Sequence, residues 1–228
     1  MAEFVLVAGA WLGSWAWEDV VPGLREAGHG AHAVTLSGVA GKREVPGGQQ
    51  KHVQDVVDVV SQGDLRDVVL VGHSYSGIPV GQAAERIGDR LKRAVFVDSN
   101  VPADGESFAS AWSEARIAEL TERGAWPPLT AEDFAGQGLS DAEIARIVEG
   151  STPHPAASLT EPAVLSRPLG EIPTTYIKCL LDGETPSPDV VELLASDRWE
   201  LVEMTTGHWP MFSQPKELTT ILLDAAKA

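Results

Sequence analysis

Cysteine and basic residues are scarce in this sequence, and each shortage excludes something. The 228 residues include one cysteine, Cys179, so no disulfide can form within the chain. Only 17 lysine and arginine residues stand against 33 aspartate and glutamate residues, which gives a formal net charge of -16. Such an acidic chain repels phosphate backbones and anionic membrane surfaces. We therefore expect neither nucleic acid nor a membrane among its partners.

Long apolar runs are also missing. No stretch approaches the roughly 20 residues that a membrane-spanning helix needs, and no basic, leader-like segment precedes the short apolar run at residues 4–8. We expect a cytoplasmic protein. The composition is that of an ordinary globular protein, with 43% hydrophobic and 22% charged residues. Length and composition together predict one α/β domain over residues 1–228.

Short apolar runs alternate with amphipathic segments of helix length. This alternation is typical of βαβ units built around a parallel sheet, so we predict an α/β fold with helices on both faces. The predicted strands cover residues 4–8, 30–35, 68–73, 93–98, 174–181 and 200–205, and the predicted helices cover residues 14–26, 50–61, 77–87, 188–195 and 215–226.

Residues 101–171 interrupt the alternation. This block is rich in proline and shows no convincing strand. Residues 104–123 predict one helix that ends at Gly124, and Ser140-Asp141-Ala142-Glu143 has the pattern of a capping box that begins another. We expect a small helical lid over the carboxyl ends of the strands, the edge at which open α/β sheets bind their ligands.

The most informative stretch is the strand at residues 68–73 with the turn that follows it. The apolar run ends in Gly72-His73-Ser74-Tyr75-Ser76, the sequence form of a nucleophile elbow, in which a strained turn lifts a serine above the sheet. Small residues are needed two places before and after the serine, and Ser76 replaces the second glycine of the usual G-x-S-x-G. Ser74 is the candidate nucleophile, and it needs a base and an acid further along the chain.

One of the six histidines lies where the base is expected. His208 follows the last predicted strand and precedes the final helix, whereas the other histidines favour structural roles. The acid should lie between serine and histidine in the chain, and Asp182 meets this order at the end of strand 174–181. Asp98, which ends strand 93–98, competes with it because a neighbouring strand tip can also reach the histidine. We favour Asp182 over Asp98 as the carboxylate that orients the imidazole.

Backbone N–H groups near the elbow are candidates for an oxyanion hole. One belongs to Tyr75, directly after the serine, and the other to Ala10, in a loop where Gly9 and Gly13 allow close backbone approach. Several large apolar residues fall in segments that can border the pocket, and they favour a flat, hydrophobic acyl or alkoxy group. The candidate substrate-binding residues are Trp11, Leu12, Trp112, Trp126, Trp209 and Met211.

These landmarks resemble the α/β-hydrolase superfamily, and in particular the plant methylesterase and hydroxynitrile lyase group and its bacterial relatives. The resemblance rests on residues 4–17, on residues 72–77, on residues 95–98, on residues 179–186 and on Gly207-His208-Trp209-Pro210-Met211. It implies a six-stranded parallel core that works without a metal or an organic cofactor. It also implies Ser74 as nucleophile, His208 as base, Asp182 as acid, and the amides of Ala10 and Tyr75 as the oxyanion hole.

Two positions separate the chain from the lyase members of that group. The lyases place a threonine in the oxyanion loop and a lysine directly after the catalytic histidine, where this chain has Gly9 and Trp209. We therefore expect a serine hydrolase that cleaves carboxylic esters of small hydrophobic or aromatic substrates through an acyl-enzyme, as a monomer or homodimer. The alternatives are a lyase or cofactor-independent oxygenase on the same scaffold, and a non-catalytic ligand receptor.

Overall fold

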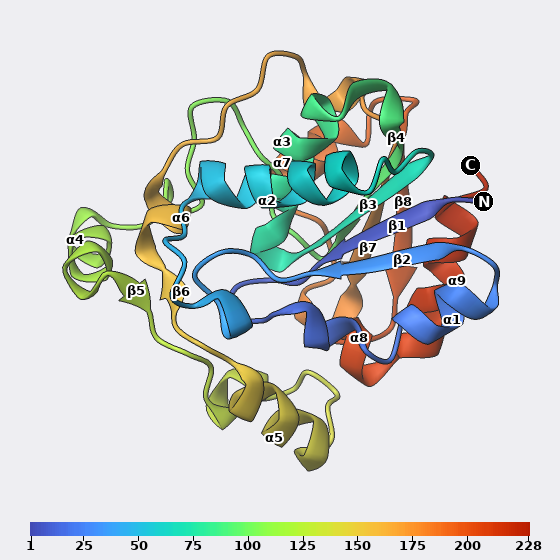
Figure 1. The fold of residues 1–228 in the computed structure, drawn as a ribbon. Helices are drawn as coiled ribbons and strands as arrows, with labels where there is room; N and C mark the ends of the chain where they lie inside the picture. The colour runs from blue at the N-terminus through green and yellow to red at the C-terminus, as the bar shows by residue number, and fades with distance from the viewer.

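A central sheet of six strands organises the protein. The computed structural model describes all residues from 1 to 228, and Figure 1 shows the sheet with helices on both sides. The strand order is β2-β1-β3-β4-β7-β8, and every neighbouring pair is parallel, as predicted. The strands are β1 (Glu3–Val7), β2 (Gly30–Val34), β3 (Val68–His73), β4 (Leu91–Val97), β7 (Thr174–Cys179) and β8 (Trp199–Met204).

Burial along the strands follows from their place in the sheet. Every residue of β3 and β7 is buried, because helices cover both faces of a parallel sheet. The edge strand β8 instead exposes Glu200 and Glu203. Charges on an edge strand oppose pairing with a further strand. The centre of the sheet is therefore the rigid part of the fold, and the candidate nucleophile follows β3 there.

Helices form a layer on each face of the sheet. On one face lie α2 (Gln49–Gln62), α3 (Gly77–Arg86) and α7 (Pro188–Leu193), and on the other lie α1 (Val21–Glu26), α8 (Pro210–Ser213) and α9 (Pro215–Ala225) (Figure 1). The helix predicted at residues 14–26 is divided into a 3₁₀ helix, η1 (Ser14–Trp17), and α1, which begins next to Pro22. No helix combines the length and the apolar character needed to cross a membrane.

The block between β4 and β7 holds the lid segments. They are α4 (Glu114–Arg123), β5 (Ala125–Trp126), η5 (Ala131–Phe134), α5 (Asp141–Gly150), β6 (His154–Pro155) and α6 (Ala156–Thr160). In Figure 1 α4 and α5 lie at the left and lower edges, away from the sheet. The two-residue strands β5 and β6 pair antiparallel and were not predicted, since so short a strand leaves no alternation in the sequence.

The ends of the lid helices show which local signals acted. The helix expected over residues 104–123 begins only at Glu114, because the Ser113 side chain caps it by accepting the Arg116 N–H at 3.3 Å. Its predicted end at Gly124 is confirmed, and that glycine has a left-handed φ of 71°. The capping box at Ser140 is confirmed as well, at the start of α5.

Candidate active site

The turn after β3 has the geometry expected of a nucleophile elbow. Ser74 has φ 55°, a left-handed conformation that costs a residue with a side chain about 1–2 kcal/mol. The strand and the next helix approach closely, since a Cβ on Gly72 would lie 3.0 Å from the Gly77 Cα and 3.0 Å from the Ser76 carbonyl oxygen. Ser76, where the usual motif has glycine, accepts the His73 N–H at 2.9 Å and donates to the Val7 carbonyl at 2.7 Å. The substitution therefore adds a hydrogen bond to the turn without obstructing it.

The loop after β1 lies against this elbow. A Cβ on Gly9 would come within 2.8 Å of the Ser74 Cβ and 2.9 Å of the His73 Nδ1, so only glycine fits there. The Leu12 N–H donates to the Gly9 carbonyl at 3.4 Å and closes a four-residue turn around Ala10 and Trp11. The structure thus brings the loop that carries Ala10 into contact with Ser74, as the prediction of an oxyanion hole requires.

Lid residues hold the backbone of Trp11 on both sides. Trp11 has φ 68°, at a turn position where glycine is usual. Its N–H donates to the Nδ1 of His154 at 3.3 Å, and its carbonyl accepts the Thr152 N–H at 3.0 Å. Burial keeps the pKa of His154 well below its usual value, so this imidazole is neutral and can accept a hydrogen bond. The strained loop conformation is therefore fixed by hydrogen bonds from the lid.

His73 connects three parts of the site. It is fully buried, and burial keeps its pKa well below the usual value. Its Nδ1 accepts the Gly9 N–H at 3.2 Å, so its Nε2 carries the proton and donates to the His208 carbonyl at 2.7 Å. Sequence reasoning gave His73 only a structural role. The structure shows that it ties the loop after β1 to the backbone of the candidate base.

His208 lies between two carboxylates. Its Nδ1 is 2.7 Å from the Oδ2 of Asp98 and 3.3 Å from the Oδ2 of Asp182. The backbone N–H of His208 donates to the Gln137 Oε1 at 2.6 Å. Burial opposes the charged imidazolium, but the two carboxylates outweigh burial and raise the pKa of His208 to about 9. The structure therefore brings the predicted base to both of the acids that the sequence offered.

The two acids differ in their surroundings. Asp182 ends the short 3₁₀ helix η7 (Leu180–Asp182), where it accepts the Gln137 Nε2 at 3.0 Å. Partial burial disfavours its charge, but the hydrogen bond to His208 prevails and holds the pKa of Asp182 well below the usual value. Asp98 is buried at the end of β4 with φ 42°, and its Oδ1 accepts the Lys178 Nζ at 2.6 Å and the Cys179 N–H at 3.2 Å.

Sequence reasoning missed Lys178, although a signal was present. A lysine in the middle of the apolar run Tyr176-Ile177-Lys178-Cys179 is unusual, because buried lysines almost always have a partner. Such a position indicates an acid on a neighbouring strand. In the structure that acid is Asp98, directly after β4, which is the strand paired with β7.

The same cluster contains the one group of side chains with the composition of a metal site. Donor atoms of Asp98, Asp182 and His208 lie within 4.8 Å of one another. The Lys178 ammonium group already lies against Asp98, and the His208 Nδ1 is directed at the carboxylates. A cation on Asp98 would have to displace or face this positive charge. We therefore interpret the cluster as an acid–base group.

The predicted substrate-binding residues separate into two sets. Trp11, Trp112 and Trp126 are partly exposed and pack together, with ring centroids 4.2 Å apart for Trp11 and Trp126 and 5.4 Å apart for Trp112 and Trp126. Phe108 extends this aromatic cluster to the Tyr75 ring at 5.7 Å. The second set is buried in the apolar core on the opposite face of the sheet, and it consists of Leu12, Trp209 and Met211.

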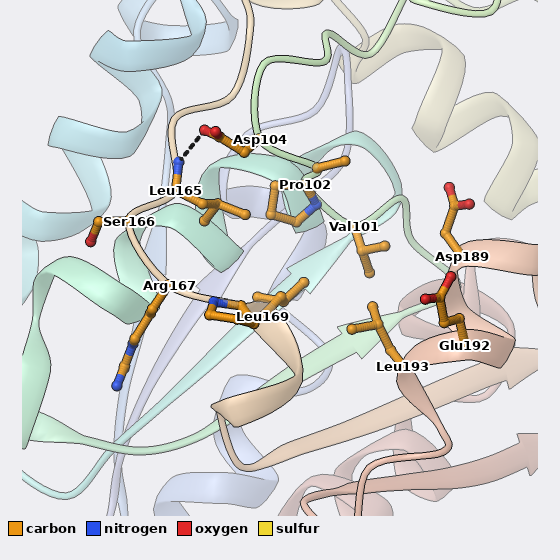
Figure 2. Close-up of a pocket in the computed structure, with 12 residues that line it drawn as sticks. Val101, Pro102, Asp104, Leu165, Ser166, Arg167, Leu169, Asp189, Glu192 and Leu193 are labelled. Atoms are coloured by element: carbon orange, nitrogen blue, oxygen red, sulfur yellow. Dashed lines mark hydrogen bonds between the residues drawn. The ribbon is translucent and has the colours of Figure 1, made fainter.

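Two pockets of the surface differ in whether predicted binding residues line them. Figure 2 shows the first pocket, which is lined by Asp104, Asp189 and Glu192 among others and by no predicted site residue. Its volume is about 460 Å³. A smaller pocket of about 170 Å³ is lined by Trp112 and Trp126. Of the two pockets, the smaller one therefore borders the predicted binding residues.

Comparison with known proteins assigns the family. The model of the alpha/beta hydrolase family matches residues 4–220, and the chain belongs to this family. Among the relatives, the carbendazim hydrolyzing esterase of Nocardioides sp. is 30% identical over 96% of this chain and 97% of its own length. Methylesterase 3 of Arabidopsis thaliana is 27% identical over 97% of this chain and 95% of its own length.

Solved structures agree on the fold. An extracellular alpha/beta-hydrolase from a Paenibacillus species superposes with a TM-score of 0.86 at 23% identity, over 100% of both chains. Polyneuridine aldehyde esterase superposes with a TM-score of 0.74 at 23% identity, over 98% of both chains. The predicted fold and the predicted resemblance to plant methylesterases and their bacterial relatives are thus confirmed.

Proposed function

We propose that the protein is a serine hydrolase that cleaves carboxylic esters of small hydrophobic or aromatic substrates. The observation that carries this proposal is the arrangement at the strand ends, where Ser74 contacts the Gly9 loop and His208 faces a buried carboxylate. The relatives support it, because both curated proteins described above are named as esterases.

The proposed mechanism uses the free nitrogen of His208. Since Nδ1 faces the carboxylates, Nε2 is available to take the proton of the Ser74 hydroxyl as the serine attacks the ester carbonyl. The amides of Ala10 and Tyr75 stabilise the oxyanion, and each such donor contributes about 10²–10³ in rate. The Ala10 N–H suits this role, because it makes no hydrogen bond within the protein. Water activated by His208 then hydrolyses the acyl-enzyme.

We propose that the aromatic cluster of Trp11, Phe108, Trp112 and Trp126 receives the substrate. Its rings are partly exposed and meet at tilted and edge-on angles, and exposed aromatic faces favour flat apolar groups. The other proposed binding residues are Leu12, Trp209 and Met211. They are buried in the apolar core on the opposite face of the sheet. The lyase alternative has less support, since Trp209 supplies no positive charge next to His208.

The proposed assembly is a single domain, residues 1–228, with residues 101–171 as its lid. We propose that it works in the cytoplasm as a monomer or homodimer, with a small-molecule ester as substrate and without a metal or cofactor. The high negative charge supports the absence of nucleic-acid and membrane partners. Light scattering after size exclusion measures the oligomeric state, and metal-chelator treatment should leave ester hydrolysis unchanged.

The experiment that tests the function is Ser74→Ala with p-nitrophenyl acetate and a fluorophosphonate probe. The variant should lose about 10⁴-fold or more in kcat and all labelling, whereas Ser187→Ala, at an exposed serine, should keep both. Retained turnover in Ser74→Ala with loss in a His208 variant would instead support the lyase or oxygenase. An unlabelled wild type would support the receptor.

A further inference from the structure

One imidazole proton faces two acceptors in this site. The His208 Nδ1 carries a single hydrogen, which forms its stronger bond with the nearer and better-fixed oxygen. The Oδ2 of Asp98 lies at 2.7 Å, within normal hydrogen-bond range, and the Oδ2 of Asp182 lies at 3.3 Å. The distances therefore favour Asp98.

Burial and anchoring favour the same residue. The Asp98 side chain is 2% exposed and that of Asp182 is 38% exposed. The second oxygen of Asp98 is held by the Lys178 ammonium group and by the Cys179 N–H. Asp182 is held by the side chain of Gln137, which belongs to the lid. A carboxylate fixes an imidazole only as firmly as it is fixed itself, and Asp98, directly after β4, is held by two groups of the neighbouring strand β7.

We propose that Asp98, rather than Asp182, is the carboxylate that orients His208, and that Lys178 is a positioning residue that acts through Asp98. This inference rests on the proposed function, since it concerns the base of the same reaction. It reverses the preference for Asp182 that chain order and family resemblance favour. Asp182 remains near the imidazole as a second negative charge on its solvent side.

Lys178 balances the charge of this arrangement. Two carboxylates beside one imidazole favour its charged form and raise the pKa of His208, and a nearby positive charge opposes that rise. The Lys178 Nζ lies against Asp98 and also donates to the Asp182 carbonyl at 3.3 Å, so it offsets one carboxylate and joins the tips of both strands. Of the other titratable neighbours, His73 on β3 is neutral, and its ring centroid lies 4.8 Å from that of His208. Tyr176 and Cys179 on β7 are neutral too, because burial and the charge of Asp98 raise their pKa values.

Matched amide substitutions distinguish the two acids. Asp98→Asn should lower kcat by about 10³–10⁴-fold with little change in KM, because an amide stabilises the wrong imidazole tautomer. Asp182→Asn should lower kcat by about tenfold or less. The apparent pKa of kcat/KM should also fall further in Asp98→Asn than in Asp182→Asn. Equal losses, or a larger loss in Asp182→Asn, would overturn the proposal.

A double variant controls for loss of activity through misfolding of Asp98→Asn. Asp98→Asn leaves the Lys178 ammonium group buried without its partner, so Asp98→Asn/Lys178→Met removes both charges together. Thermal unfolding monitored by circular dichroism tests whether this variant is folded. It retains Asp182 as its one carboxylate near His208. A folded double variant with kcat within tenfold of wild type would refute the role of Asp98, and a loss of at least 10³-fold supports it.

The role of Lys178 has its own readout in the pH profile. Lys178→Met should raise the apparent pKa of kcat/KM, because one positive charge beside the cluster is lost, and Lys178→Arg should restore the wild-type midpoint. Lys216→Met, at an exposed lysine, is the control and should not move it. An unchanged midpoint in Lys178→Met would show that Lys178 does not act through the cluster.

Failure of this inference is distinguishable from failure of the proposed function. Fluorophosphonate labelling of wild-type Ser74 tests the function before any acid is changed. If the wild type is labelled and Asp182→Asn is the inactive variant, only the inference fails. If the wild type is not labelled and Ser74→Ala retains turnover, the proposed function itself fails, whatever Asp98 does.

Discussion

The backbone N–H of Trp11 donates a hydrogen bond to the Nδ1 of His154, 3.3 Å away, and this bond joins the loop after β1 to β6 of the lid. Thr152 completes the attachment by donating its N–H to the Trp11 carbonyl. Trp11 directly follows Ala10, whose N–H is the proposed oxyanion donor. The lid therefore contributes to the shape of the catalytic loop as well as to the substrate pocket.

Replacing His154 tests this contribution. His154→Leu removes the acceptor of the Trp11 N–H, and we expect kcat to fall by about 10- to 100-fold, because small displacements of catalytic groups cost this much. His29→Leu is the matched control, since the His29 Nδ1 accepts the Ala2 N–H at 3.1 Å far from the site. Steady-state kinetics should separate the two variants, and an equal kcat in both would contradict the role of the lid.

A methyl group on Gly9 should disrupt the site directly. In Gly9→Ala the new Cβ would lie 2.8 Å from the Ser74 Cβ and 2.9 Å from the His73 Nδ1, so the loop or the elbow has to move. We expect a loss of about 10²-fold in kcat/KM. Gly41→Ala is the control, because no atom lies within 4 Å of a Cβ there. Normal activity of Gly9→Ala would show that the loop is not in catalytic contact with Ser74.

The pH dependence of catalysis should reflect the state of His208. Two carboxylates raise the pKa of His208 to about 9, against the effect of burial, and only the neutral imidazole can take the serine proton. We therefore expect kcat/KM to increase about tenfold per pH unit below pH 9 and to level off above it. Initial rates corrected for spontaneous hydrolysis provide the measurement. A plateau that begins near pH 6.5 would contradict it.

Buried histidines should set the lower pH limit of stability. Burial lowers the pKa of His52, His73 and His154 below the usual 6.5, so the folded state keeps them neutral. Their stabilisation is present above pH 6.5. As the pH falls below that value the unfolded chain binds more protons, and each histidine removes about 1.4 kcal/mol per pH unit from the free energy of unfolding.

His208 acts in the opposite direction. Its pKa is raised, so its contribution to stability is complete below pH 6.5 and is lost as the pH rises towards 9. The free energy of unfolding should therefore be greatest near neutral pH. Urea denaturation between pH 5 and 9 measures it, and His154→Leu should reduce the slope below pH 6.5 by one proton. A stability that still increases towards pH 5 would disprove this account.

The sequence was sufficient for the sheet and insufficient for the lid. Parallel strands buried on both faces appear as apolar runs, and β3 was predicted to the residue. Residues 104–113 carry Phe108 and Trp112 at helical spacing, yet they form turns. These rings pack on Tyr75 and Trp126, so tertiary contacts determine the local structure there.

The site was predictable where chain order constrained it. Ser74 and His208 follow strands in the expected order, and they stay predictions until tested. The choice between Asp98 and Asp182 depends on distances of 2.7 Å and 3.3 Å from one nitrogen of His208, and no sequence pattern carries such a difference. The bond between Trp11 and His154 joins residues 143 positions apart, beyond any local motif.

The hydrogen bonds between the lid and Trp11 have a consequence for turnover. If the lid moved away as one piece, the hydrogen bonds of Thr152 and His154 to Trp11 would break. The strained turn would then relax, so the open protein would be inactive. Substrates should therefore enter through rotation of individual indole rings, among them Trp112 and Trp126. Bulky esters that require a wider opening would then be poor substrates, because admitting them would break the hydrogen bonds that hold the oxyanion loop in its catalytic conformation.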